Sequence, residues 1–582
     1  MIVKTFTQLK KNLKVNLSGF KKIRLALLGD TSTQLLNQAL RGLGVDYGFD
    51  LTVWEADFNQ IERQVFDYSS DLYEFKPEVV IVFLSSHKLL GKYNKQTQEQ
   101  RVSFADRQLE LITHIYDNIT GNLAVPVIFY NLPEIDDSIF GSYSNQVGAS
   151  FPFQVRKLNY ELMLFTLRMP TFYLCDLSAI QNRVGRGVMF SPSIYVNTEM
   201  VLTIDVLPEV AARSLDLVVA MQGRVRKCLI LDLDNTLWGG VIGDDGIENI
   251  QLGVLGIGKA FTEFQYWIKK LKDRGIILAV CSKNTESVAK EPFEKHPDMV
   301  LRLDDIAVFV ANWENKVDNI RLIQQSLNIG FDSMVFLDDN PVERSIVREN
   351  VTGITVPELP EDPADYLEYL YSLNLFETLS YSNEDVMRTQ LYQVETQRRE
   401  VKEKFANEDD FLESLNMVST VEPFTKFNTP RVAQLSQRSN QFNLRTIRHT
   451  EADIESIVTG SDQFGFAFAL EDKFGDNGMI CTVILERENE DFLFINTWFM
   501  SCRVLKRGME NFVINTLVEF ANEMGCVCLI GEYIPTVKNE MVKDHYLDLG
   551  FLYVEGRWQL DVSGYQKKKT FINRKAVLRP GN

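Results

Sequence analysis

The chain has 582 residues, a length that corresponds to three or four domains of ordinary size. Hydrophobic residues make up 45% and charged residues 24%, a globular balance that excludes wholesale disorder. The 79 acidic and 61 basic residues give a net charge of −18. This charge argues against a general nucleic-acid binder, because phosphate backbones require clustered positive charge.

The chain also lacks the usual signs of a membrane or secreted protein. No apolar run approaches the roughly 18 residues of a membrane span, and the N-terminus has no apolar signal-peptide block. The seven cysteines are scattered and odd in number, so we expect no disulfide framework. With only five histidines, we expect no structural zinc site. These features predict a soluble, cytoplasmic protein that binds neither membrane nor nucleic acid.

The first segment, residues 1–222, alternates short apolar runs with helical patterns such as 101–116. The runs are 23–28, 79–84, 125–130 and 173–175. Apolar strands that alternate with helices are typical of a parallel sheet covered on both faces. We therefore predict a first α/β domain over these residues.

The second segment, residues 223–375, repeats this pattern more strongly. Its buried-strand runs are 228–231, 276–280 and 334–337. Each run ends abruptly in polar residues, and the carboxyl ends of parallel strands lie on one edge of the sheet, where ligands bind. The three polar clusters should therefore converge at one site.

The last third of the chain begins with a charged connection and ends in a different α/β pattern. Residues 376–424 are predicted to form a helical linker, with a solvated helix over 383–415. From 425 to 582 the expected elements are a hairpin, a helix and a strand. The hairpin joins 480–485 to 492–500, the helix covers 508–523 and the strand covers 526–530.

The polar cluster after the first strand of the second segment carries two carboxylates, Asp232 and Asp234. An aspartate nucleophile attacks phosphorus, and a second aspartate protonates the leaving oxygen. Both carboxylates would repel a phosphate unless a divalent cation bridges them, and oxygen ligands with phosphate favour Mg²⁺. Asp338 and Asp339 supply further oxygens, so the predicted metal ligands are Asp232, Asp234, Asp338 and Asp339.

Three further residues are assigned to phosphate binding. Ser282 ends the second strand and can donate its hydroxyl, Asn284 stands in the same polar cluster, and Lys316 supplies positive charge. Together with the carboxylates, these residues resemble the four motifs of the haloacid-dehalogenase (HAD) superfamily in their usual order. The motif residues are Asp232, Asp234, Thr236, Ser282, Lys316, Asp338 and Asp339.

This resemblance implies phosphoryl transfer to water, because Asp234 stands at the position of the general acid and base. Only 49 residues separate Asp232 from Ser282, and 21 separate Lys316 from Asp338. Neither interval has room for a large cap domain beyond a sheet and its helices. We therefore expect a capless HAD core. Its substrate is either tethered to a macromolecule or covered by the flanking domains.

Longer motifs resemble one branch of that superfamily, the FkbH-like proteins. They occupy residues 231–246, 312–316, 336–344 and 434–443, and the similarity extends over about 20–560. The best-known activity of this family loads a glyceryl unit from 1,3-bisphosphoglycerate onto an acyl carrier protein with loss of phosphate. The resemblance thus implies a Mg²⁺-dependent phosphohydrolase coupled to acyl transfer.

The first domain resembles the SGNH esterases in its residues 28–32, within a flavodoxin-like sheet. Thr31 stands where those enzymes carry a serine, and Asp176 has Ala179 rather than histidine three residues on. A nucleophile without its base is not activated. We expect a non-hydrolytic domain that helps to bind or cover the substrate.

The last domain resembles the GNAT acyltransferases. Its loop 503–508 precedes a helix, where backbone N–H groups suit a pyrophosphate, although Lys506 replaces the usual glycine. The predicted residues for an acyl or CoA-type ligand are Arg503, Arg507, Gly508 and Tyr546. Cys502 is the candidate thioester nucleophile, because neighbouring cations lower a thiol's pKa; a buried inert cysteine and a packing tyrosine are the alternatives.

Three functions remain open at this stage. The first is a Mg²⁺-dependent phosphatase that also acylates a carrier protein, which the basic tail after Gly564 could dock. The second is a stand-alone phosphatase acting on a small sugar or acyl phosphate. The third is a protein that recruits a partner through its flanking domains. The complete set of motif residues argues against the third.

Overall fold

The computed structural model describes residues 4–575 except 382, 403, 440, 502, 503 and 537. The chain divides into two compact units, one ending at Ala220 and the other beginning at Met221. None of the described helices combines the length and apolar character needed to cross a membrane.

The first unit contains a five-stranded parallel sheet in the order β2-β1-β3-β4-β5. Its strands are β1 (Lys21–Gly29), β2 (Phe49–Glu55), β3 (Val79–Phe83), β4 (Val127–Tyr130) and β5 (Phe172–Cys175). Its helices are α1 (Phe6–Asn12), α2 (Gln34–Asp46), α3 (Ile61–Phe66), α4 (Asp71–Phe75), α5 (Ser86–Asn94), α6 (Gln98–Val102), α7 (Phe104–Leu123), α8 (Phe151–Arg168), α9 (Leu177–Val184), α10 (Arg186–Met189), α11 (Pro192–Thr198) and α12 (Leu207–Met221).

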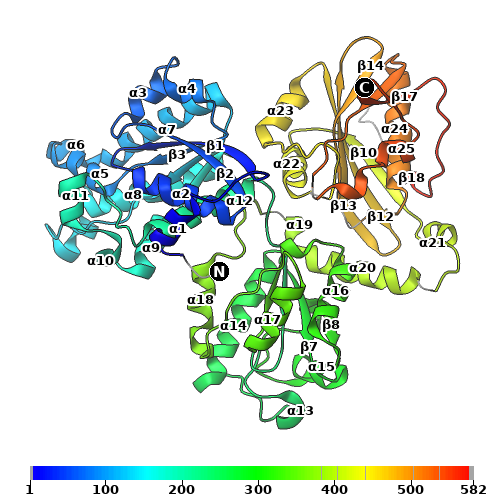
Figure 1. Cartoon of the computed structure of the whole chain (residues 1–582), viewed down its shortest axis with the longest axis horizontal. Helices are drawn as coiled ribbons and strands as arrows, with labels where there is room; N and C mark the ends of the chain where they lie inside the picture. The colour runs from blue at the N-terminus through cyan, green and yellow to red at the C-terminus, as the bar shows by residue number, and fades with distance from the viewer. Residues whose placement is uncertain are drawn as a thin grey trace. The chain divides into compact units, whose positions relative to one another are not determined.

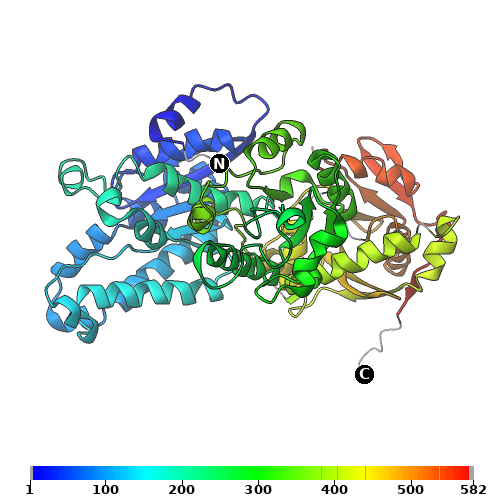
Figure 2. The ribbon, with the colours of Figure 1, turned by 90° about the horizontal axis from the view of Figure 1, so that it is seen from below.

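This sheet carries helices on both faces, with α3, α4 and α7 on one side and α1 and α2 on the other (Figures 1 and 2). Leu28 and Val82 of the strands pack with Ile112 of α7 and Leu158 of α8 in one core. The strand order is that of flavodoxin-like folds. The sequence prediction missed β2, because this edge strand is only partly buried and has no continuous apolar run.

The second unit begins with a four-stranded parallel sheet in the order β8-β7-β6-β9. The strands are β6 (Cys228–Leu231), β7 (Ile277–Ser282), β8 (Ile306–Ala311) and β9 (Met334–Leu337). The helices are α13 (Ile242–Asp245), α14 (Gly256–Asp273), α15 (Glu286–Lys295), α16 (Lys316–Leu327), α17 (Pro341–Asn350) and α18 (Tyr366–Leu373). The short α13 and the crossover helix α14 fill the interval between β6 and β7, which agrees with a capless core.

A mixed sheet follows in the order β16-β17-β15-β14-β13-β12-β10-β18, with β11 paired to β14. Its strands are β10 (Val418–Pro423), β11 (Phe442–Asn443), β12 (Gln463–Asp472), β13 (Gly475–Arg487), β14 (Phe492–Met500), β15 (Cys528–Gly531), β16 (Leu552–Val554), β17 (Arg557–Asp561) and β18 (Asn573–Arg574). Its helices are α22 (Thr429–Arg438), α23 (Glu451–Thr459), α24 (Met509–Glu523) and α25 (His545–Asp548). The predicted hairpin is β13 with β14, and the sheets together confirm the α/β class.

The helices between these two sheets are α19 (Asn383–Val386), α20 (Arg388–Lys402) and α21 (Glu408–Ser414). The prediction of a solvated helix is wrong for α20. Tyr392 is buried against the core of the four-stranded sheet, and Arg398 is 3% exposed. The sequence of α20 is mostly polar, yet one face of this helix is buried: Tyr392 packs on the four-stranded sheet and Arg398 pairs with Asp472 of the mixed sheet.

A buried charge cluster fixes α20 to the mixed sheet. Asp472, at the end of β12, accepts from Arg398 at 2.9 Å and from Arg507 at 3.1 Å. Glu395 pairs with the same two arginines. The side chain of Asp472 is fully buried, so each partner compensates a charge that has no access to water.

We predict that Asp472→Asn strongly destabilises this part of the chain, because two buried guanidinium groups then share one carboxylate. The expected loss is about 3–5 kcal/mol, the usual cost of breaking a buried ion pair. Urea denaturation followed by circular dichroism measures it. The matched control is Glu471→Gln, whose exposed pair with Lys575 should contribute less than about 1 kcal/mol. Equal midpoints for the two variants would contradict the prediction.

Candidate functional site

Two carboxylates meet where neighbouring parallel strands end. Asp232 follows β6 and Asp338 follows β9, and the register pairs Leu231 with Leu337 directly before them. Both strands are wholly buried, so their polar continuations are buried too: Asp232 is 6% exposed and Asp338 0%. The predicted convergence at one edge of the sheet is present.

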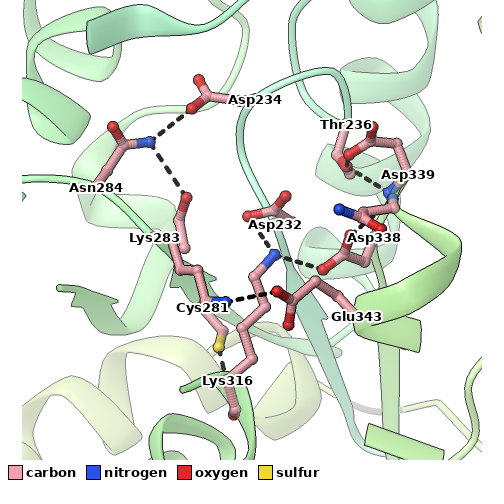
Figure 3. Close-up of polar contacts among 12 residues, drawn as sticks. Asp232, Asp234, Thr236, Cys281, Lys283, Asn284, Lys316, Asp338, Asp339 and Glu343 are labelled. Carbon is pink, nitrogen blue, oxygen red and sulfur yellow. Dashed lines mark hydrogen bonds and ion pairs between the residues drawn. The ribbon is translucent and has the colours of Figure 1, made fainter. Parts of the chain in front are cut away.

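The ammonium group of Lys316 lies between these two carboxylates (Figure 3). Its Nζ is 3.1 Å from Asp232 Oδ1 and donates to Asp338 Oδ2. Lys316 is the first residue of α16, whose N-cap is Asn315, accepting from the Asp318 N–H. The cap fixes the start of the helix and thereby the direction in which the lysine enters the site.

The buried charges shift one another's protonation. Burial raises the pKa of Asp232 to about 7, with Lys316 opposing and Asp338 adding to the shift. Burial alone would lower the pKa of Lys316, but the charges of Asp232 and Asp338 raise it above its usual value. Burial and the neighbouring Asp338 likewise raise the pKa of Asp339. The site therefore holds more negative charge than one lysine compensates.

Asp339 completes a group of three carboxylates. One oxygen each of Asp232, Asp338 and Asp339 lies within 4.8 Å of the others. Hard oxygen donors of this kind suit Mg²⁺, and a divalent cation would stabilise the ionised form of carboxylates that burial disfavours, such as Asp232. The residues present therefore fit the predicted ion.

The predicted metal-ligand role of the Asp234 side chain needs correction. Its carboxylate is outside this group and points to the other side of the loop (Figure 3). It accepts from Trp238 Nε1 and the Ile242 N–H at 3.0 Å, and from Asn284 Nδ2 at 2.8 Å. Three donors hold this carboxylate in one orientation, as a positioned acid and base requires.

The predicted phosphate-binding residues lie close together at the end of β7. Ser282 and Asn284 are 1% and 3% exposed, and Asn284 Nδ2 donates to Ser282 Oγ at 3.4 Å. Since Asn284 also bonds Asp234, it joins the phosphate-binding end of β7 to the second carboxylate. The structure thus brings Ser282, Asn284 and Lys316 to the same sheet edge.

The sequence analysis gave no role to Arg344, which supports the metal ligands from behind. Its Nη1 donates to the carbonyls of Asp338 and Asp339 at 2.8 and 2.6 Å. Thr236 Oγ1 accepts from the Asp339 N–H at 3.1 Å. The signal was available, because Arg344 closes the motif 336–344 that carries the family resemblance.

The first unit does not assemble an esterase site from its predicted residues. Asp176 is the N-cap of α9, accepting from the Ala179 N–H at 2.8 Å and from Asn131 Nδ2 at 2.6 Å. Thr31 is fully buried behind β1. Neither observation tests the activity of this domain, whose non-hydrolytic role stays a prediction.

Two of the residues predicted to bind an acyl or CoA-type ligand in the last domain are buried. Arg507 is a correction: it is 5% exposed and committed to Glu395 and Asp472, so it is not available to a ligand. Tyr546 is 1% exposed and packs its ring against Phe551, which fits a packing tyrosine rather than a general acid.

The rest of that predicted site is only partly described. Gly508 is the N-cap of α24 with φ +76°, and Lys506 also has a left-handed backbone at φ +62°, a conformation that explains why glycine is usual there. Cys502 and Arg503 lie outside the described residues.

Comparisons with known proteins agree with these observations. Residues 24–219 match the family described as FkbH, N-terminal domain. The chain is similar to a solved structure of the N-terminal part of the protein BF1531 from Bacteroides fragilis, which contains a phosphatase domain complexed with Mg. The sequence identity is 57% and the TM-score 0.63, over 65% of this chain and 100% of that chain.

Two acetyltransferases match the chain more distantly. Mutant forms of the spermidine/spermine N-acetyltransferase from Vibrio cholerae share 13% identity over 25% of this chain and 95% of theirs, with a TM-score of 0.20. The ribosomal-protein-S18-alanine N-acetyltransferase from Escherichia coli shares 16% sequence identity. The match covers 26% of this chain and 99% of that chain, with a TM-score of 0.20. At this TM-score neither likeness bears on the fold or the function. No curated protein matches the chain.

We predict that phosphatase turnover is lost on chelation and restored by Mg²⁺, because the three clustered carboxylates repel a phosphate without the ion. Hydrolysis of p-nitrophenyl phosphate measures this, and calorimetry measures Mg²⁺ binding directly. Asp338→Asn should weaken Mg²⁺ binding about tenfold or more, because the loss of a residue that merely orients a metal ligand already costs about 10–100-fold in affinity. The exposed Asp244→Asn is the control. Undiminished turnover after exhaustive chelation would contradict the prediction.

The two first-motif carboxylates should differ in their effect on turnover. Asp232→Asn removes the nucleophile, and we expect no measurable hydrolysis. Asp234→Asn keeps the nucleophile and should reduce kcat by about 10²–10⁴-fold, the usual range for a lost general acid. Steady-state kinetics with folded variants, checked by circular dichroism, distinguish the two. If Asp232→Asn retains most of the activity, the nucleophile is another group.

Proposed function

The chain belongs to the FkbH-like family of the HAD superfamily, and from this premise we propose that it hydrolyses a small phosphorylated substrate and transfers its acyl group to an acyl carrier protein. The phosphatase step rests on one observation: Lys316 bridges Asp232 and Asp338 at adjoining strand ends. The acyl-transfer step goes further and rests on the family resemblance.

In the phosphatase step, Asp232 attacks phosphorus and the bond from phosphorus to the leaving oxygen breaks. Asp234 gives its proton to that oxygen, then takes a proton from the water that hydrolyses the aspartyl-phosphate. Ser282, Asn284 and Lys316 bind the phosphoryl oxygens. Mg²⁺, held by Asp232, Asp338 and Asp339, would neutralise the charge between phosphate and carboxylates.

The acyl-transfer step requires a second nucleophile, since a phosphatase site alone cannot deliver an acyl group to a carrier thiol. Our candidate is Cys502 in the last domain. Its thiolate would attack the carbonyl carbon of the acyl phosphate, and that phosphate would leave. The phosphatase site would hydrolyse the remaining phosphate ester, and the carrier thiol would take the acyl group from the thioester, which releases the Cys502 thiolate. We assign this step to residues 425–582 and substrate covering to residues 1–222.

A stand-alone phosphatase is the second candidate, and two observations favour it. The burial of Arg507 in an ion cluster and of Tyr546 in the core removes two of the predicted acyl-site residues. The basic tail gives only weak support for carrier docking, because Lys567, Lys569 and Lys575 already pair with surface carboxylates.

Carrier loading and phosphate release, measured on the same samples, test the proposal. We expect incubation with 1,3-bisphosphoglycerate and a phosphopantetheinylated carrier protein to produce a glyceryl mass shift on the carrier, read by intact-protein mass spectrometry. Cys502→Ser should abolish this shift but leave p-nitrophenyl phosphate hydrolysis nearly intact, because the phosphatase residues are untouched.

The control for that variant is Cys526→Ser in the same domain, which should keep both activities; the thiol of Cys526 bonds the carbonyl of Glu490. Loading that survives Cys502→Ser would make Cys502 a packing residue. If the wild type releases phosphate but loads no carrier protein, the stand-alone phosphatase is the function.

A further inference from the structure

A second lysine, Lys283, lies at the carboxyl edge of the four-stranded sheet beside the phosphatase residues. It directly follows Ser282, the last residue of β7, and its Nζ pairs with Glu343 at 2.5 Å (Figure 3). Glu343 is in the first turn of α17, the helix that follows β9. Because β7 and β9 lie on either side of β6, this ion pair spans the strand that Asp232 follows.

Exposure separates Lys283 from the residues at the floor of the site. The side chain of Lys283 is 41% exposed, whereas that of Lys316 is 4% exposed and Ser282 is buried. The phosphoryl group must reach the buried residues, so the rest of a substrate extends from them toward solvent. Lys283 is therefore placed to contact a part of the substrate other than the reacting phosphoryl group.

The ammonium group of Lys283 has the capacity to bind a further partner. An ammonium group donates three hydrogen bonds, and that of Lys283 donates one, to Glu343, among the residues that the structure describes. The flexible side chain of a lysine lets its charge follow a ligand. Since an ion pair with partly exposed members contributes little to stability, a small movement of Lys283 costs little.

Glu343 orients Lys283 without using up its positive charge. The backbone N–H groups in the first turn of α17 carry a partial positive charge, which stabilises an acidic side chain at that place. The charge of Glu343 is therefore shared between the helix and the lysine. Glu343 is thus a positioning residue, which directs the Lys283 ammonium group.

The charges at the floor of the site determine which substrates need Lys283. Mg²⁺ and Lys316 would together balance the three clustered carboxylates of Asp232, Asp338 and Asp339. A bound phosphate dianion then leaves the site negative, and it would repel a second negative group on the same substrate. A cation placed outside the floor attracts that second group, whereas an uncharged organic part gains no such attraction.

We propose that Lys283 determines substrate specificity by binding a second anionic group of the substrate while Asp232 attacks the phosphoryl group. The preferred substrate is a small organic phosphate that also carries a carboxylate or a second phosphate. This inference rests on the phosphatase function proposed above, and it names the substrate class of that same site.

Calorimetric titration of the full-length protein with two phosphonates, in the presence of Mg²⁺, tests the proposal. 3-Phosphonopropionate carries a carboxylate beyond its phosphonate, and propylphosphonate has the same number of carbon atoms but no carboxylate. Neither probe has the phosphorus–oxygen ester bond that the phosphatase step breaks, so binding is measured without turnover. We expect 3-phosphonopropionate to bind about fivefold tighter, the difference that an ion pair of about 1 kcal/mol produces.

The test variant is Lys283→Gln, which removes the charge and keeps a polar side chain. It should abolish the preference by weakening the binding of 3-phosphonopropionate and leaving that of propylphosphonate nearly unchanged. The matched control is Lys290→Gln on α15, because Lys290 is 34% exposed and pairs with Glu286 one helical turn away. This control should keep the fivefold preference. Circular dichroism checks that both variants are folded.

Each outcome decides the proposal. Loss of the preference in Lys283→Gln but not in Lys290→Gln supports it. A preference that survives in Lys283→Gln overturns it, as does a wild type that binds both phosphonates equally or binds neither. An equal loss of affinity for both probes in Lys283→Gln places this lysine on the reacting phosphoryl group and also overturns it.

Hydrolysis of p-nitrophenyl phosphate, measured separately, distinguishes failure of this inference from failure of the proposed function. If the wild type hydrolyses no phosphate ester but its preference for 3-phosphonopropionate depends on Lys283, the phosphatase function fails and the anion-binding role of Lys283 stands. If hydrolysis is present but the preference is absent, the phosphatase function stands and the role of Lys283 fails.

Discussion

The rest of the site depends on one interaction: the ammonium group of Lys316 forms ion pairs with both Asp232 and Asp338. Parallel pairing of β6 with β9 forces the two carboxylates together where both strands end. Taking ions out of water costs several kcal/mol each, so two adjacent buried carboxylates need a buried cation. Lys316 supplies only one positive charge, and burial still raises the pKa of Asp232 although this lysine opposes the shift.

That constraint explains why the active edge could be predicted from the sequence. An apolar run that ends in acidic residues identifies a strand and its carboxyl end at once, and β6 and β9 follow this rule. The strand β8 was missed although its run, Ile306–Ala311, is as apolar as the others. Its run ends in Asn312 rather than in a pair of acidic residues, so the pattern that identifies β6 and β9 is absent from it.

The orientation of side chains was harder to predict than their position. Asp232 and Asp234 are two residues apart at a turning backbone, and spacing alone places both in one pocket. The structure separates them, because Trp238 and Asn284 capture the second carboxylate. Such partners come from the following loop and from the next strand, and their positions depend on the folded backbone rather than on local spacing.

In the last domain, the prediction failed where charged residues that are far apart in the sequence form buried ion pairs. Arg507 looked like a ligand-binding residue because it stands in a cationic loop before a helix. It instead reaches Asp472 of β12 and Glu395 of α20, far away in the sequence. The same cluster turns a polar linker pattern into a packed helix, and both errors have one cause: ion pairs between remote segments leave no periodic signal.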